Sequence, residues 1–158
     1  ASAAEACGRV PETVAVVREP LARLESWHRY LARDKVAGAA HSTAGLGFAA
    51  FVEGVLAPGR PRWPQVGRQD RFVGWDGQAA LVDHLFDHAR LDLLVAFLAG
   101  RLGAAFALPA RNISPARVAE PLPAALMAQV RAVRAAEFAL HEAVAREGHL
   151  RRISSSAR

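Results

Sequence analysis

The sequence predicts an α/β protein in which a short parallel sheet is flanked by helices. Two short apolar runs, Thr13–Val17 and Leu81–Phe86, have the composition of buried strands. Each run is followed by a longer segment whose apolar residues recur every three or four positions, which is the period of a helix. Alternation of strands and helices is typical of α/β folds. With 158 residues, 52% of them apolar, the chain is large enough for one domain with a core of its own.

The first strand and helix meet at a sharp boundary. The β-branched run stops at Arg18, and Pro20 suits the first turn of a helix because its missing N–H would be unpaired there. The periodicity predicts a helix over Pro20–Asp34, with Leu24 and Leu31 on its apolar stripe and His28 as a buried, satisfied histidine.

The middle of the chain mixes short elements with a rigid loop. Leu46–Leu56 is predicted to be a short amphipathic helix, and Arg71–Trp75 a short strand. Pro58–Gln65 contains three prolines, which remove backbone donors and restrict their neighbours, so it is predicted to be a basic loop.

The last third is predicted to be mostly helical. Leu91–Leu102 is a helix ended by Gly103, and Pro121–Glu147 is one long helix ended by Gly148. The domain is expected to cover residues 1–150, and residues 151–158 are expected to form a disordered basic tail.

The composition limits the classes of partner. The net charge of +5 is carried almost wholly by arginine, with Lys35 as the sole lysine, so anionic ligands are favoured. The arginines are scattered rather than banded with aromatic residues, which argues against nucleic acid. Cys7 is the single cysteine, so no intrachain disulfide can form, and the most apolar stretch is interrupted by Asp92 and Arg101 and predicts no membrane span. The arginine-rich, lysine-poor composition predicts a bacterial protein. A cytoplasmic location is expected, because the single cysteine requires no oxidising compartment.

Arg18 and Ser26 form a candidate anion clamp. A strand that ends in Arg18 and turns directly into a helix places that arginine at the carboxyl edge of the sheet, where open α/β folds bind ligands. A guanidinium offers a planar fork of donors, and the hydroxyl of Ser26 on the following helix adds one more.

The segment from Val17 to Ser26, V-R-E-P-L-A-R-L-E-S, resembles the 3′-phosphate-binding motif of the sulfotransferase superfamily. The nearest type is the carbohydrate sulfotransferase branch and its bacterial relatives, with Glu19 in place of the usual aspartate. The resemblance implies a P-loop-like sulfotransferase fold. It also implies 3′-phosphoadenosine 5′-phosphosulfate as the sulfate donor, with no metal. Arg18 and Ser26 would hold its 3′-phosphate.

The resemblance continues in order to about Val144. It includes a Pro-Gln pair ending at Gln65, a strand and helix closing at Gly103, an L-P-x-x-N-x-S loop around Arg111, and a final helix with His141 where the family has tyrosine. The resemblance implies transfer of a sulfuryl group to a hydroxyl of a carbohydrate or small metabolite. Further candidate site residues are Arg23 and Arg111 for the nucleotide, Gln65 for the acceptor and His41 as the general base.

The sequence also departs from the family. Only a few residues precede Thr13, and they contain no Gly-rich basic loop of the kind that cradles the 5′-phosphosulfate. The acidic residue expected after the second strand is also missing, since Ala89 occupies its place. We therefore expect this chain to carry the 3′-phosphate-binding half of an enzyme and to be incomplete at its N-terminus. Loss of a first strand and helix would expose a strand edge.

Two alternatives remain open from the sequence. The first is a non-catalytic, degenerate sulfotransferase-like module that binds a nucleotide or a partner chain. The second is a metal site at His84 and His88, which would share a face only on a helix. The prediction of a strand through His84, and the lack of a third ligand, argue against the metal.

Overall fold

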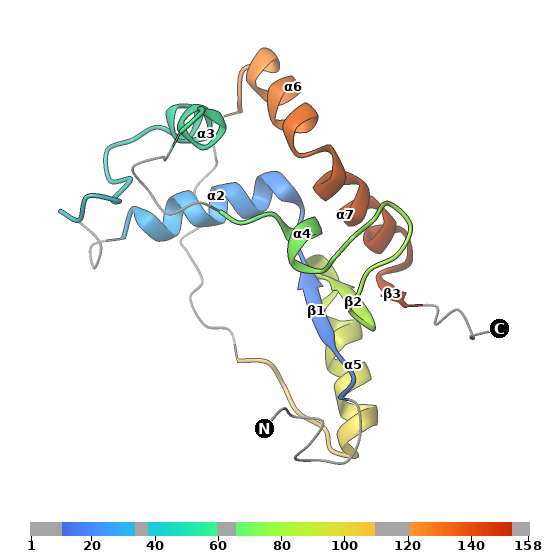
Figure 1. The fold of residues 1–158 in the computed structure, drawn as a ribbon. Helices are drawn as coiled ribbons and strands as arrows, with labels where there is room; N and C mark the ends of the chain where they lie inside the picture. The colour runs from blue at the N-terminus through green and yellow to red at the C-terminus, as the bar shows by residue number, and fades with distance from the viewer. Residues whose placement is uncertain (1–10, 34–37, 60–65, 110–120, 153–158) are drawn as a thin grey trace, which may run out of the picture.

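The computed structural model describes residues 11–33, 38–59, 66–109 and 121–152, which form a three-stranded sheet with helices around it (Figure 1). The strands are β1 (Val14–Val17), β2 (His84–Asp87) and β3 (His149–Arg151). Strand β1 pairs with β2 in parallel, with Val14 opposite His84, and β2 pairs with β3 in antiparallel fashion. The α/β prediction is confirmed, but the sheet is mixed rather than wholly parallel.

The helices follow the predicted order along the chain. Helix α2 begins at Pro20, as predicted, and its first turn is capped by Glu19, whose carboxylate accepts a hydrogen bond from the N–H of Ala22 at 2.6 Å. Helix α5 has the predicted bounds and ends at Gly103 with φ of 65°. The helices are α2 (Pro20–Leu31), α3 (Phe48–Leu56), α4 (Gln69–Phe72), the 3₁₀ helix η2 (His88–Arg90), α5 (Leu91–Leu102), α6 (Ala124–Val133) and α7 (Ala135–Glu147).

The predicted strand over Arg71–Trp75 is wrong. That segment lies at the end of α4 and in the turn after it, where the N–H of Trp75 donates to the carbonyl of Asp70 at 2.8 Å. Apolar alternation over five residues is too short to distinguish a strand from a helical turn. Here Val73 is 2% exposed and Phe72 is 84% exposed, so only one of the two apolar residues enters the core.

The predicted long helix is divided at Arg134, which separates α6 from α7 and has φ and ψ of −110° and 23°. The carbonyl of Val133 accepts a hydrogen bond from Arg68 at 3.0 Å instead of completing the helix. Arg134 itself is 6% exposed. The division follows from tertiary polar contacts, which apolar periodicity does not report.

The boundary of the predicted tail is also wrong. Arg151 belongs to β3, and the N–H of Arg152 donates to the carbonyl of Asp83 at 2.8 Å. The glycine turn at Gly148, with φ of 72°, reverses the chain after α7 and makes this pairing with β2 possible. Residues 153–158 lie outside the described part of the chain.

Two hydrophobic clusters make up the core. One lies between α2, α3 and α6 and includes Leu24, Phe51 and Val130, which are all 0% exposed. The other lies between the sheet and α7 and includes Val17, Leu85 and Leu140. None of the helices within the described ranges is long and apolar enough to cross a membrane.

Candidate functional site

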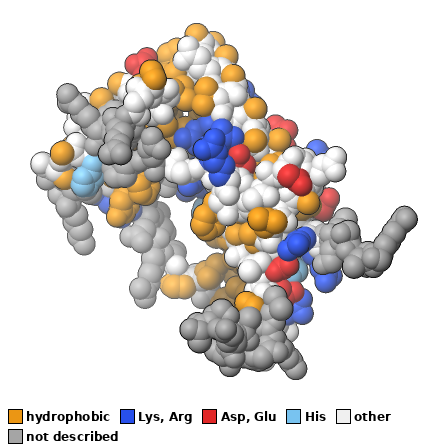
Figure 2. Space-filling model, in the orientation of Figure 1, with side chains coloured by type: hydrophobic (Ala, Val, Ile, Leu, Met, Phe, Trp, Pro, Cys, Tyr) orange, Lys and Arg blue, Asp and Glu red, His pale blue; other side chains and the backbone are white. Residues whose placement is uncertain are grey.

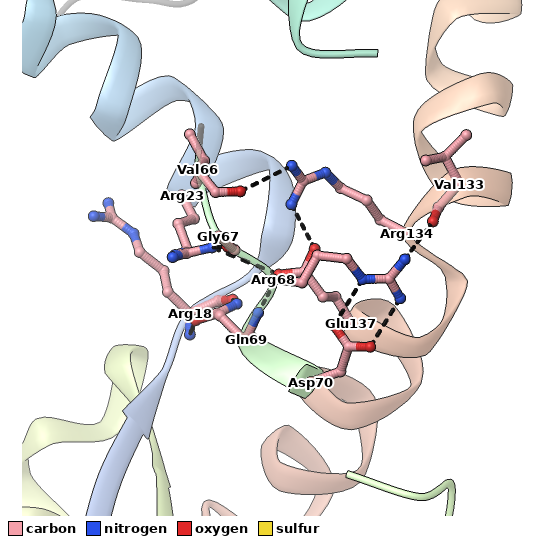
Figure 3. Close-up of polar contacts among 10 residues, drawn as sticks. All are labelled: Arg18, Arg23, Val66, Gly67, Arg68, Gln69, Asp70, Val133, Arg134 and Glu137. Carbon is pink, nitrogen blue, oxygen red and sulfur yellow. Dashed lines mark hydrogen bonds and ion pairs between the residues drawn. The ribbon is translucent and has the colours of Figure 1, made fainter. Parts of the chain in front are cut away.

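Arg18 lies immediately after β1, at the carboxyl end of the parallel strand pair. Its backbone is fixed by Gln69, which accepts from the N–H of Arg18 at 2.9 Å and donates to its carbonyl at 2.8 Å. In Figure 3 the guanidinium of Arg18 points away from the polar cluster to its right. No ion pair or side-chain hydrogen bond of Arg18 occurs within the described ranges. The backbone of Arg18 is therefore fixed, while its guanidinium is not paired with any residue that the structure describes.

A buried carboxylate organises the neighbouring cluster. The side chain of Glu137, at the start of α7, is 0% exposed and is hydrogen-bonded to Arg134 on one oxygen and to the N–H of Gln69, at 2.8 Å, on the other. Arg23 from α2 lies 3.6 Å from Glu137 and donates a hydrogen bond to the carbonyl of Gly67. Burial lowers the pKa of Arg23, and the charge of Arg134 acts in the same direction, while Glu137 opposes both.

A second pair adjoins this carboxylate. Arg68 donates two hydrogen bonds to the carboxylate of Asp70, at 3.0 Å and 2.8 Å. It donates a third to the carbonyl of Val133, at the α6–α7 boundary. Burial of Asp70 opposes its ionisation, but the paired donors of Arg68 outweigh that effect and lower its pKa. Bidentate pairs of this kind are among the stronger charged contacts in proteins.

The cluster has more positive than negative charge. Arg18, Arg23, Arg68 and Arg134 supply four guanidinium groups, and Asp70 and Glu137 supply two carboxylates. Figure 2 shows basic side chains gathered in the middle of one face, where α2, α4 and the α6–α7 boundary meet. Because the other three arginines contact carboxylates, Arg18 is the member whose charge is unneutralised by any described neighbour. The site is suited to an anion.

The end of β2 places further ionisable groups at the same edge of the sheet. Asp87 closes β2, where its carboxylate accepts from the N–H of Ala89 at 3.0 Å and lies 3.6 Å from Nε2 of His141 on α7. Asp87 pairs with Val17 in the sheet, so the next residues, His88 and Arg18, both leave the sheet at this edge. Burial and the charge of Arg18 lower the pKa of His88.

The sequence analysis did not assign Asp87 to the candidate anion site. The expected acidic position was assigned to Ala89 by alignment, whereas β2 ends at Asp87. The pattern F-D-H-A, with an aspartate at the end of a strand and before a helical turn, was the available signal.

The predicted site residues are only partly brought together. Ser26 is half-buried in the second turn of α2, and Arg23, on the same helix, is drawn into the contacts with Glu137 and Gly67. His41 lies in the loop that hydrogen-bonds to the far end of α2, where the N–H of Thr43 donates to the carbonyl of Leu31. A helix of 12 residues is about 18 Å long. The structure therefore places His41 and Arg18 at opposite ends of α2 (Figure 1).

Two predicted site residues, Gln65 and Arg111, lie outside the described residues. The structure also places His28 and the two histidines of the alternative metal site, His84 and His88. His28 donates a hydrogen bond through Nε2 to the carbonyl of Leu46, at 2.8 Å, so it is satisfied as expected, but it is half-buried rather than buried. His84 begins β2 and His88 follows its end, so the strand separates them. No group of three metal-ligating side chains occurs in the described part of the chain.

His84 belongs to a second group of polar contacts, at the other end of the strands, where β1 and β2 begin. Its Nδ1 lies 2.9 Å from Nε2 of His149, and its Nε2 lies 2.6 Å from Glu12. Arg101 of α5 contacts the same Glu12 oxygen at 2.7 Å. The hydrogen bond to His84 lowers the pKa of Glu12. These contacts tie the start of β1 to β2, β3 and α5.

Comparison with known proteins gives no match to a family model, a curated protein or a solved structure.

Proposed function

We propose that this chain binds the 3′-phosphate of 3′-phosphoadenosine 5′-phosphosulfate, as part of a sulfotransferase that transfers a sulfuryl group to a hydroxyl of a carbohydrate or small metabolite. The observation that carries the proposal is the guanidinium of Arg18, which has no ion pair or hydrogen bond with any described residue. It stands at the carboxyl edge of the sheet, next to a cluster in which the other arginines contact carboxylates. An arginine with a fixed backbone and an unneutralised charge is a favourable donor to phosphate.

The start of α2 supports binding through side chains rather than through the helix terminus. Glu19 already caps the first turn with its own carboxylate, so a second anion placed directly on these N–H groups would be repelled. Arg18 before the helix and Ser26 within it remain as donors, and no side-chain hydrogen bond of Ser26 occurs among the described residues. This agrees with the roles that the sulfotransferase motif gives to the two positions.

Arg23 has a supporting role in this proposal. Its contacts with Glu137 and Gly67 hold the start of α2 against the 66–70 segment, which in turn fixes the backbone of Arg18 through Gln69. Arg23 therefore positions the clamp and adds positive potential without being a free ligand.

A second candidate function is a non-catalytic module that binds a nucleotide or a partner chain. The observation in its favour is that His41, the candidate general base, lies in the loop at the far end of α2 from Arg18. Both candidates predict binding of the nucleotide, and only the first predicts sulfuryl transfer.

The test is calorimetry with 3′-phosphoadenosine 5′-phosphate, compared with adenosine 5′-phosphate, which lacks the 3′-phosphate. We expect the first ligand to bind more tightly. Arg18→Ala should weaken its binding by roughly tenfold or more, since a hydrogen bond to a charged group contributes about 1.5–3 kcal/mol. Arg146→Ala removes the same charge from an exposed position in the last turn of α7 and should leave binding unchanged. Equal affinity for the two ligands, or equal loss in both variants, would contradict the proposed clamp.

A further inference from the structure

Arg18 and His88 leave the sheet side by side. Val17 pairs with Asp87 in the parallel register of β1 and β2, so the residue that follows each strand stands next to its counterpart. Neighbouring strands lie about 4.8 Å apart. Asp87 has an extended backbone, with φ and ψ of −75° and 131°. Arg18 continues the line of β1, because Gln69 bonds to both its N–H and its carbonyl. The two side chains therefore begin at adjacent positions.

The side chains of Arg18 and His88 project from the same face of the sheet. Side chains alternate between the two faces along a strand. Val17 packs in the cluster with α7, and the carboxylate of its partner Asp87 lies 3.6 Å from Nε2 of His141 in α7. Arg18 and His88 each follow by one residue, so they project from the face opposite α7. The guanidinium of Arg18 accordingly points away from the polar contacts that α7 makes (Figure 3).

This face gives an anion access to two basic groups. Arg18 is half-buried and His88 is exposed. Neither side chain has an ion pair or a hydrogen bond with another residue that the structure describes. Val16, which shares this face of β1, is 39% exposed. An anion in solution can therefore reach both side chains without displacing an existing contact.

The charged groups around His88 leave it beside one unpaired cation. Asp87 lies on the α7 face, and Arg90 is neutralised by Asp92 at 2.9 Å. Partial burial of the ring lowers the pKa of His88, the charge of Arg18 lowers it further, and Asp87 opposes both. The charged or titratable groups in the elements around His88 are Arg18 after β1, Asp87 at the end of β2, Arg90 and Asp92 at the start of α5, and His141 in α7.

We propose that His88 is a second ligand of the anion that Arg18 binds, and that it takes up a proton from solvent when a doubly charged tetrahedral anion, the dianion of a phosphate monoester, binds. This inference rests on the proposed function, because it concerns the same anion site. One guanidinium neutralises half of such a charge, and the other half favours a proton on the neighbouring imidazole. The protonated ring then donates a hydrogen bond to the anion. His88 therefore favours dianions over singly charged anions, which Arg18 alone neutralises.

Binding should strengthen as the pH falls. The anion raises the pKa of His88 from a value below 6.5 in the free protein to a higher value in the complex. Between these two values one proton is taken up with each anion, so the affinity rises by up to about tenfold for each unit of pH. Below the lower value His88 is protonated with or without the anion, and the dependence ends.

The first test follows the pKa of His88 by NMR of the histidine ring protons. The probe is sulfate, which stays doubly charged across the pH range in which histidine titrates, and chloride at the same ionic strength is the singly charged control. His88→Gln identifies the signal of His88 by its loss. We expect sulfate to raise the pKa of His88 by about 1 relative to chloride. An unchanged pKa in sulfate would overturn the proposal.

The second test asks whether Arg18 and His88 bind the same anion. In Arg18→Ala, sulfate should no longer raise the pKa of His88, because the anion has lost its permanently charged partner. Arg146→Ala removes the same charge from an exposed position in the last turn of α7 and should leave the effect of sulfate intact. An effect of sulfate in Arg18→Ala as large as in the wild type would contradict a shared site.

The third test measures the affinity for sulfate at about pH 8 and about pH 6, where the wild type should bind roughly fivefold or more tightly at the lower pH. His88→Gln keeps a hydrogen-bond donor without a titratable group, so its affinity should change little with pH. His141→Gln should keep the dependence of the wild type. Loss of the dependence in His141→Gln, with its retention in His88→Gln, would place the proton on His141 and overturn the proposal.

These measurements can fail separately from the proposed function. Sulfate contains no adenosine, so a raised pKa of His88 in sulfate supports the joint site even where 3′-phosphoadenosine 5′-phosphate binds no more tightly than adenosine 5′-phosphate. In that case the proposed function is wrong and this inference stands. Tight binding of 3′-phosphoadenosine 5′-phosphate that leaves the pKa of His88 unchanged would instead overturn this inference alone.

Discussion

At the scale of single residues, the most informative feature is the guanidinium of Arg18, which follows β1 and has no partner among the described residues. Gln69 satisfies the backbone of Arg18 completely, which leaves the side chain as the variable part of the site. Burial and, to a smaller extent, the charge of the nearby Arg18 lower the pKa of His88 below its ordinary value of 6.5. The pKa of His88 is therefore sensitive to the charge of Arg18. A histidine whose pKa is lowered in the folded state binds protons less readily than in the unfolded chain. Its contribution to stability is therefore lost as the pH falls below about 6.5.

Arg18→Ala should raise the pKa of His88. Removal of the guanidinium removes one cause of the lowered value, while burial remains, so the pKa should stay below 6.5. The titration can be followed by NMR of the histidine ring protons. The variant should also lose less stability than the wild type between about pH 6.5 and 5, for the same reason. The matched variant Arg146→Ala should leave the titration of His88 unchanged. A lower pKa of His88 in Arg18→Ala would contradict this account of the site.

At the scale of elements, the structure depends on how helices end. Helices α5 and α7 both stop at glycines with positive φ, Gly103 at 65° and Gly148 at 72°. The two positions differ in their surroundings. A Cβ added to Gly148 would lie 2.7 Å from Cδ1 of Leu93, whereas one added to Gly103 would meet nothing within 4 Å. The turn at Gly148 therefore combines a required backbone conformation with close packing against α5, and it leads directly into β3.

Gly148→Ala should destabilise the protein more than Gly103→Ala. Both substitutions force alanine into the left-handed region, at a cost of roughly 1–2 kcal/mol. Gly148→Ala also requires the end of the Leu93 side chain to shift, which adds up to about 1 kcal/mol. Urea denaturation of the two variants measures the difference directly. Equal destabilisation would show that Leu93 adapts without cost and that α5 does not constrain the α7–β3 turn.

The elements also show what sequence patterns can and cannot predict here. Strand β1 and helices α2 and α5 were predicted well because β-branched runs, Pro20 and Gly103 are local signals. The break at Arg134 and the strand after Gly148 were not predicted, because they depend on contacts with Arg68 and Asp83, which are distant in sequence. The position of Arg18 at the strand end was predicted for the same local reason. The ion pair between Arg23 and Glu137 could not be predicted from the sequence, since the two residues are more than a hundred positions apart.

At the scale of the whole molecule, polar contacts join two separate hydrophobic clusters. Helix α7 contributes to both, with Phe138 in the cluster of α2, α3 and α6, and Leu140 in the cluster of the sheet. Glu137 precedes both residues and binds groups from α2, the 66–70 segment and the α6–α7 boundary. The contacts that surround the candidate anion site therefore also connect the two hydrophobic clusters.

Glu137→Ala should destabilise the protein strongly and weaken the coupling between its two parts. Arg134, whose side chain is 7% exposed, and the N–H of Gln69 would both lose their partner. Breaking a buried ion pair by removing one member costs about 3–5 kcal/mol. The matched variant Glu25→Ala removes the surface pair with Arg29, at 3.5 Å, and should cost no more than about 1 kcal/mol.

Hydrogen exchange can distinguish lost coupling from uniform loss of stability. In the wild type we expect the slowest amides of α2 and of β2 to exchange with similar protection, because both are released by the same global unfolding. In Glu137→Ala the two sets should separate, since each hydrophobic cluster can then open without the other. A parallel loss of protection in α2 and β2 would mean that apolar contacts along α7 alone hold the clusters together. Separation of the two sets would mean that Glu137, and with it the arginines around the anion site, is what makes the fold cooperative.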